Sequence, residues 1–376
     1  MIYSIHTMAL DVNPDTNKFQ KLRHRAYGNS ESSHRMYNKK GSDTVIDTAL
    51  ADKGIKIEYH DGIYKKKIRL IINPTTILGG NDIKKLWKPT KDNISKLLKR
   101  LKKYINDYFD SKYKLKDFTL TRIDFTVNID VGSNENVAAY IRVLHNIGKV
   151  KGFAPKYDDN DIGIDKTLSF DLEGNSNGID FTVYDKEGAS NRKEARGILR
   201  VEVRLMKQKT IRKHTNTTDI SKQIKDLALS SRSIFLSTFL HIVPHGDYFK
   251  KKDVVEVINK NIVKKVPKKK MLTLLDLIPK KKSLYLAQKE MNDRNIDKVM
   301  KMFAELGVSP VTISKRHNIK HLKSLYSFLY ENWFYILIIN MDTTYPADGG
   351  RGMSAFIIYS DERMLTWWYV GCIVPH

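Results

Sequence analysis

Strict alternation of apolar and polar residues marks three segments in the first half of the chain, at residues 122–128, 179–186 and 199–205. Side chains of a β-strand point to opposite faces in turn, so each segment predicts a strand with one apolar and one polar face. A half-buried antiparallel sheet of any function shows this pattern against water. The alternation alone therefore predicts a sheet and leaves its function open.

The polar faces of these three strands carry chemical groups that can work together. Asp124 and Glu202 supply carboxylates, which suit a hard divalent cation. Tyr184 supplies a hydroxyl that can act as a nucleophile, and Lys186 lies on the same face of its strand. Guanidinium groups suit phosphate, and they come from Arg122, Arg200 and Arg204. If the strands share a sheet, the combination predicts phosphate chemistry on one face.

The remaining patterns of the first half predict a hairpin, two helices and two loops. Residues 55–72 form a hairpin around an Asp-Gly turn. An apolar stripe at helical spacing predicts a helix over 92–110 that begins at Asp92, and a second helix follows Gly132. The polar stretches expected to be loops are 13–52 and 154–178. This order predicts an α+β fold, with an antiparallel or mixed sheet and helices packed on one face.

The character of the chain changes after about residue 213. Residues 214–335 are basic and carry mainly helical patterns, with lysine clusters at 264–270 and 280–282. We therefore divide the chain into a region 1–213 that holds the candidate site, a basic helical accessory region 214–335, and a tail 336–376 without an assigned structure.

Charge narrows the class of partner. The chain of 376 residues has 66 Lys+Arg against 42 Asp+Glu, a formal net charge of +24, which favours nucleic acid as partner before an anionic membrane. On the helix over 92–110 the candidate phosphate contacts are Lys99, Arg100 and Lys103. No apolar run is long enough to span a bilayer, so no membrane partner is expected.

Other chemistry finds no support in the sequence. The single cysteine, Cys372, excludes an intramolecular disulfide and a cysteine-based zinc site, and it fits a reducing cytoplasm. No Walker-type phosphate loop occurs, so nucleotide hydrolysis has no motif behind it.

Five short motifs, taken in chain order, resemble the gene II/X replication initiators of filamentous phages and related plasmid rolling-circle initiators. The motifs are residues 71–80, Thr121–Asp124, 134–138, Val183–Lys186 and Leu199–Arg204. The resemblance covers roughly residues 55–210. It implies that region 1–213 is a DNA nicking and joining domain and that 214–335 is an accessory DNA-binding region.

The resemblance also implies a mechanism and a set of site residues. Tyr184 would join the 5′ phosphate of one origin strand by metal-dependent transesterification and leave a 3′-hydroxyl primer for rolling-circle replication. Asp124 and Glu202 would hold Mg²⁺ or Mn²⁺. Many relatives supply a metal-binding histidine from a His-hydrophobic-His triplet that is absent here, and His60 is the candidate third ligand. The implied partners are locally single-stranded origin DNA, host helicase and host polymerase, in the cytoplasm of a bacterial host cell.

Two other functions stay open from the residues alone. One is a non-catalytic DNA-binding regulator of replication or transcription, in which the basic helices read DNA and the sheet is a scaffold. The other is a metal-dependent nuclease that uses water as nucleophile. A covalent protein–DNA adduct separates the tyrosine mechanism from both.

Overall fold

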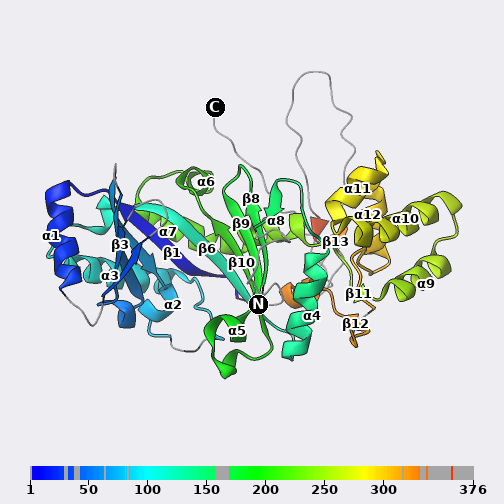
Figure 1. Ribbon diagram of the computed structural model, residues 1–376, viewed down its shortest axis with the longest axis horizontal. Helices are drawn as coiled ribbons and strands as arrows, with labels where there is room; N and C mark the ends of the chain where they lie inside the picture. The colour runs from blue at the N-terminus through cyan, green and yellow to red at the C-terminus, as the bar shows by residue number, and fades with distance from the viewer. Residues whose placement is uncertain are drawn as a thin grey trace, which may run out of the picture.

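The computed structural model describes most of the chain up to residue 330. The described ranges are residues 2–28, 33–37, 43–62, 65–80, 82, 84–156, 169–315, 317–330, 336–337 and 357–358. The protein is elongated, with a large sheet in one part and the helices α9–α12 at the opposite end (Figure 1).

Ten strands of the described residues form one sheet in which every pairing is antiparallel. Across the sheet the order is β2 (Ser33–Tyr37), β3 (Asp43–Asp47), β4 (Ile55–Asp61), β5 (Lys66–Ile72), β1 (Ser4–Val12), β6 (Thr119–Asp130), β10 (Ile198–Leu205), β9 (Ile179–Asp185), β8 (Ser169–Gly174) and β7 (Phe153–Pro155). The predicted α+β fold is confirmed, and the three alternating segments are the neighbouring strands β6, β10 and β9.

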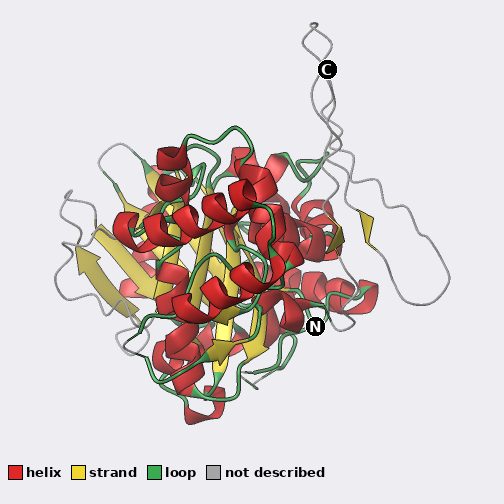
Figure 2. Cartoon of the chain, turned by 90° about the vertical axis from the view of Figure 1, so that its right-hand side faces the viewer, coloured by secondary structure: helices red, strands yellow, loops and turns green. Residues whose placement is uncertain are grey.

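The helices of the first two thirds of the chain pack against this sheet or beside it. They are α1 (Thr16–Tyr27), α2 (Pro74–Ile77), α3 (Lys91–Tyr108), α4 (Asn134–His145), α5 (Lys186–Ser190), α6 (Gln208–Arg212), α7 (Ile220–Leu229) and α8 (Ser231–Ile242). Seen end-on, helices lie in front of the strands (Figure 2). The predicted helix over 92–110 is α3, but its N-cap is Thr90, whose hydroxyl accepts from the Asn93 amide.

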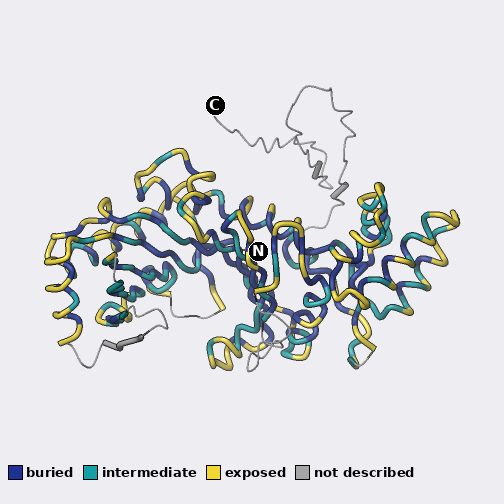
Figure 3. Tube along the Cα trace, turned by 45° about the horizontal axis from the view of Figure 1, so that its top comes forward, coloured by how far each residue is buried: buried dark blue, intermediate teal, exposed yellow. Residues whose placement is uncertain are grey.

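The apolar face of the sheet is covered in part by α8. Phe239 of α8 packs on Phe181 of β9, and Phe235 packs edge-to-face on Tyr3 at the start of the chain. All four side chains are buried, and the strands at the centre of the molecule are largely buried as well (Figure 3). Burial of the apolar face leaves the polar residues of β6, β9 and β10 on the opposite face.

The C-terminal helices share one hydrophobic core with the sheet. The remaining elements are β11 (Tyr248–Phe249), α9 (Lys251–Asn261), α10 (Lys265–Lys281), α11 (Leu284–Met291), α12 (Ile296–Glu305), β12 (His321–Leu322), α13 (Leu325–Leu329), β13 (Ile336–Leu337) and β14 (Ile357–Ile358). Tyr3 donates to the Leu329 carbonyl, and Tyr140 of α4 donates to the Lys323 carbonyl. Because α7 and α8 follow residue 213 and α8 covers the sheet, a cut there would remove part of the core.

Both segments expected to be loops contain regular structure. Asp15 caps α1, which buries Phe19, Leu22 and Ala26 at helical spacing in a stretch that is polar overall. The short strands β2 and β3 extend one edge of the sheet, and β7 and β8 extend the other. Of the tail 336–376, only the β13–β14 ladder lies within the described residues. No helix among them combines the length and apolarity needed to cross a bilayer.

Candidate active site

The register of three strands brings the predicted site residues together. Strand β10 lies between β6 and β9, with Arg200 directly opposite Tyr184 and Arg204 directly opposite Asp124. Residues opposite each other in an antiparallel pair project from the same face. Glu202, two residues along β10, therefore lies on this face too, and a hydroxyl, two carboxylates and several cations share one surface.

Tyr184 is hydrogen-bonded directly to one of the two carboxylates, Glu202. The Tyr184 hydroxyl donates to Glu202 Oε1 at 2.8 Å. Burial, together with the negative charge of Glu202, raises the pKa of Tyr184 above its ordinary value. Burial also acts to raise the pKa of Glu202, but the positive charge of Arg204 and other cations outweighs it and lowers that pKa. The pair is therefore a neutral tyrosine held by an ionised carboxylate.

Arginines engage both buried carboxylates. Arg122 binds Asp124 with two hydrogen bonds, from Nε to Oδ1 at 2.8 Å and from Nη2 to Oδ2 at 2.5 Å. Arg204 donates from Nη2 to Glu202 Oε2 at 2.8 Å, and its Nε lies 4.0 Å from Asp124 Oδ2. Burial raises the pKa of Asp124 to about 6, although Arg122 opposes this shift.

The same ion pairs decide whether a divalent metal fits. Both oxygens of Asp124 accept from Arg122, and those of Glu202 accept from Tyr184 and Arg204. Within the described part of the chain, no group of three or more His, Cys, Asp or Glu side chains is placed to hold a metal ion. A cation would have to displace an arginine, so this arrangement does not fit bound Mg²⁺ or Mn²⁺.

The structure does not bring His60 to the two carboxylates. His60 lies on β4, and β5 and β1 separate β4 from β6. Three interstrand spacings put it roughly 14 Å from the strand of Asp124. Its ring nitrogens instead lie 3.1 Å from Glu58 Oε2 and 3.1 Å from Thr44 Oγ1. Alternation along the sequence shows which face a residue occupies, but not the order of the strands.

A different histidine, His6, lies beside the site. It sits on β1, next to β6, where the register shifts between Ile5 and Thr7. Its Nε2 lies 3.1 Å from Arg200 Nη1, and its buried Nδ1 has no hydrogen-bond partner among the described residues. Burial, with the charge of Arg200, lowers the pKa of His6 to about 4. Local patterns did not indicate this residue, because neither face of residues 1–12 is clearly polar.

The other candidate residues occupy two separate places. Lys186 begins α5 directly after β9, and burial, with the charge of Arg200, lowers its pKa to about 8. Lys99 and Lys103 are exposed on α3. Arg100 donates to the Ile77 carbonyl at 2.7 Å, which gives it a structural contact as well. Helix α3 packs against α2 and α7, so its lysines form a surface of their own.

Comparisons with known proteins include a distant likeness to a solved structure. No family model and no curated protein matches the chain. The fold is similar to the solved structure of a rolling circle replication initiator protein from Geobacillus stearothermophilus, at 13% sequence identity and a TM-score of 0.28. The match covers 71% of this chain and 90% of that chain. A likeness this distant assigns neither an activity nor any site residue.

Proposed function

We propose that the protein is a replication initiator that nicks one DNA strand by tyrosine transesterification. The observation that carries the proposal is the Tyr184–Glu202 hydrogen bond on a sheet face that also holds Arg200 and Arg204, with Lys186 at the start of α5 directly after β9. A nucleophile in contact with a proton acceptor, beside cations that suit phosphate, is the constellation that such a reaction needs. The motif resemblance of residues 55–210 points to the same reaction.

The proposed step balances with groups of this face. Tyr184 Oη attacks phosphorus, and Glu202, already bonded to the hydroxyl, takes the proton. The bond from phosphorus to the 3′ oxygen breaks as the bond to tyrosine forms. We assign Lys186, whose pKa is lowered to about 8, as the acid that donates a proton to the leaving oxygen. Arg200 and Arg204 offset the charge that develops on the phosphate oxygens.

The identity of the partner follows from charge and chemistry. The net charge of +24 favours a polyanion, and the motif resemblance implies a locally single-stranded origin as its target. We therefore propose origin DNA as the substrate in a bacterial cytoplasm. A free 3′-hydroxyl would serve a host polymerase, and unwinding would need a host helicase.

Mg²⁺ or Mn²⁺ stays a separate proposal, with Asp124 and Glu202 as its ligands after Arg122 and Arg204 turn away. Such an ion would stabilise negative charge on the phosphate. Asp124→Ala and Glu202→Ala should each abolish nicking and leave DNA binding at low salt largely intact, because dispersed cations supply that binding. Nicking at the wild-type rate by either variant would contradict the roles given to these carboxylates.

The deciding experiment is Tyr184→Phe, which keeps the ring and removes the attacking oxygen. Wild-type protein incubated with labelled origin-like single-stranded DNA and Mn²⁺ should give a covalent adduct on a denaturing gel, and Tyr184→Phe should give neither adduct nor cleavage. Tyr104→Phe on α3 is the matched control and should behave as wild type. Continued cutting by Tyr184→Phe would favour the water-dependent nuclease, and an absence of cutting by wild type would favour the non-catalytic regulator.

A further inference from the structure

A large basic cavity lies where the edge of the sheet meets the C-terminal helices. Its volume is about 1160 Å³. One wall is the segment between α4 and β7, the second is the start of β8, and the third comprises the α10–α11 corner and residues 312–315. We call this cavity the junction groove. None of the site residues predicted from the sequence lines it.

The walls of the junction groove are held together by backbone contacts. The Leu284 amide donates to the Ile147 carbonyl at 2.9 Å, and Ser283 Oγ donates to the Lys149 carbonyl at 3.2 Å. Gly148 sits between them at a φ of +60°, and a Cβ there would lie 2.4 Å from the Lys282 carbonyl oxygen. The absence of a side chain allows this close approach, which brings two walls of the groove into direct contact.

The charge of the groove is strongly positive. Its lining includes five lysines against one acidic residue, and the lysines are Lys149, Lys251, Lys281, Lys282 and Lys315. The acidic residue, Asp171, accepts a hydrogen bond from Ser169. Lys251 and Lys281 are paired with Asp276 and Glu290. Lys149 and Lys315 are exposed, with no ion-pair partner among the described residues, and they are available to phosphate.

One end of the groove reaches the strand next to the candidate nucleophile. Ser169 lines the groove and is paired directly with Tyr184 in the β8–β9 register. Neighbouring strands lie about 4.8 Å apart, so a chain that leaves the groove at Ser169 is one strand away from Tyr184. The groove and the candidate site therefore adjoin along the sheet.

We propose that the junction groove binds the sugar–phosphate backbone of the single strand that flanks the phosphate attacked by Tyr184. Lys149 and Lys315, which come from two different walls of the groove, contact its phosphates. That the bound strand flanks the attacked phosphate rests on the proposed nicking function. That the groove binds single-stranded DNA does not rest on it. The groove would set the direction in which the strand crosses the sheet.

The test measures the salt dependence of binding. A fluorescent single-stranded oligonucleotide is titrated with protein over a series of NaCl concentrations, and anisotropy gives the affinity. All proteins carry Tyr184→Phe, so no covalent step contributes. In Lys149→Gln/Lys315→Gln, the loss of two contacts should lower the slope of log affinity against log salt by roughly 1.4, at about 0.7 per single-strand phosphate. Lys149→Glu/Lys315→Glu should weaken binding further.

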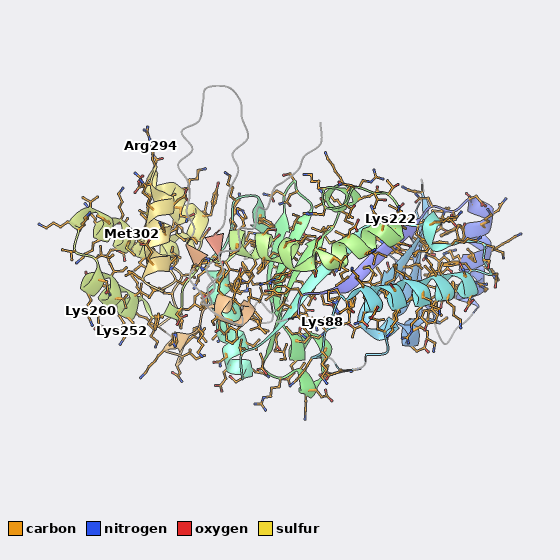
Figure 4. All side chains as sticks on the ribbon, turned by 180° about the vertical axis from the view of Figure 1, so that it is seen from behind. Lys88, Lys222, Lys252, Lys260, Arg294 and Met302 are labelled. Atoms are coloured by element: carbon orange, nitrogen blue, oxygen red, sulfur yellow. The ribbon has the colours of Figure 1, made fainter. Side chains whose placement is uncertain are left out.

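The matched control is Lys222→Gln/Lys260→Gln, which removes the same charge from two exposed lysines outside the groove (Figure 4). Both control lysines lie in region 214–335, so this variant measures what two ordinary surface charges contribute, and it should lower the slope by less than the groove variant. Equal melting temperatures confirm that each variant is folded. Equal slopes for the groove and control variants would overturn the proposal.

The failure of either proposal can be recognised separately. An adduct on Tyr184 with an unchanged slope in the groove variants would reject the groove and keep the nicking function. A lowered slope in the groove variants, with no adduct from wild-type protein on any DNA, would keep the groove as a single-strand site and reject the nicking function.

Discussion

Replacement of Gly148 by alanine tests how the sheet is joined to the C-terminal helices. Gly148 has a φ of +60°, and a Cβ would lie 2.4 Å from the Lys282 carbonyl oxygen and 2.8 Å from Ser283 Cβ. Neither neighbour is the end of a flexible side chain, so the backbone of the α10–α11 corner must move. Gly148→Ala should therefore destabilise the protein and open the junction groove.

The expected loss of stability in Gly148→Ala has two parts, a conformational one and a steric one. The left-handed conformation costs an alanine about 1–2 kcal/mol, of which about 0.4–1 kcal/mol is returned by the smaller entropy of the unfolded chain. Forced overlap in a packed interior adds about 1–3 kcal/mol. Gly148→Ala should lower the free energy of unfolding by about 1–5 kcal/mol, measured by urea denaturation at equilibrium.

The variant Gly307→Ala measures the conformational part of this loss by itself. The φ of Gly307 is +69°, and apart from this residue and its two chain neighbours, no atom of the described residues lies within 4 Å of the position that its Cβ would take. Gly307→Ala therefore carries only the conformational part. We expect Gly148→Ala to be less stable than Gly307→Ala by at least about 1 kcal/mol and to bind the single-stranded oligonucleotide more weakly. Equal stability of the two variants would refute the close junction between these segments.

Two further predictions concern the core. Phe239→Ala should lower the free energy of unfolding by about 3–5 kcal/mol, because a fully buried ring on the sheet is lost; a loss below about 1 kcal/mol would contradict the packing of α8 on β9. A fragment 1–213 lacks α7 and α8, so it should bind the dye ANS and show no cooperative thermal transition. A fragment 1–330, which retains both helices, should unfold cooperatively. Cooperative unfolding of 1–213 would show that the sheet folds without them.

Local patterns in the sequence were sufficient for the elements of the candidate site. Period-two alternation identified β6, β9 and β10, and it placed Asp124, Tyr184 and Glu202 on polar faces. Helical spacing identified α3. Each pattern arises because one face of the element is buried and the other meets water or charge. The pairing of these strands was a reasonable expectation, since sequential strands are often neighbours.

Features that depend on strand order could not be predicted from local patterns. Strand β1 comes first in the chain but lies in the middle of the sheet, between β5 and β6. That position brings His6 to the site and leaves His60 three strands away. The register shift at His6 also interrupts the alternation that would have marked it. The ion pairs of Arg122 and Arg204 depend on strand register as well. The two carboxylates that suggested a metal site, Asp124 and Glu202, are therefore bound by arginines in the structure.

The occupied carboxylates make the metal proposal testable through its dependence on DNA. Arg122 and Arg204 bind Asp124 and Glu202, and a phosphate on the same face competes for these guanidinium groups. A phosphate that draws the arginines away would leave two carboxylates free for a cation. Binding of Mn²⁺ should therefore be weak without DNA and tighter with it, and by reciprocity Mn²⁺ should tighten DNA binding by the same factor.

Electron paramagnetic resonance of free Mn²⁺ measures this coupling in Tyr184→Phe protein, where no reaction follows. Asp124→Ala should remove the coupling, because one of the two proposed ligands is lost. His60→Ala is the matched control and should retain it, since His60 lies three strands from Asp124. Mn²⁺ binding of equal strength with and without DNA would refute the competition between phosphate and carboxylate for the arginines. Loss of coupling in His60→Ala would refute the separation of that histidine from the site.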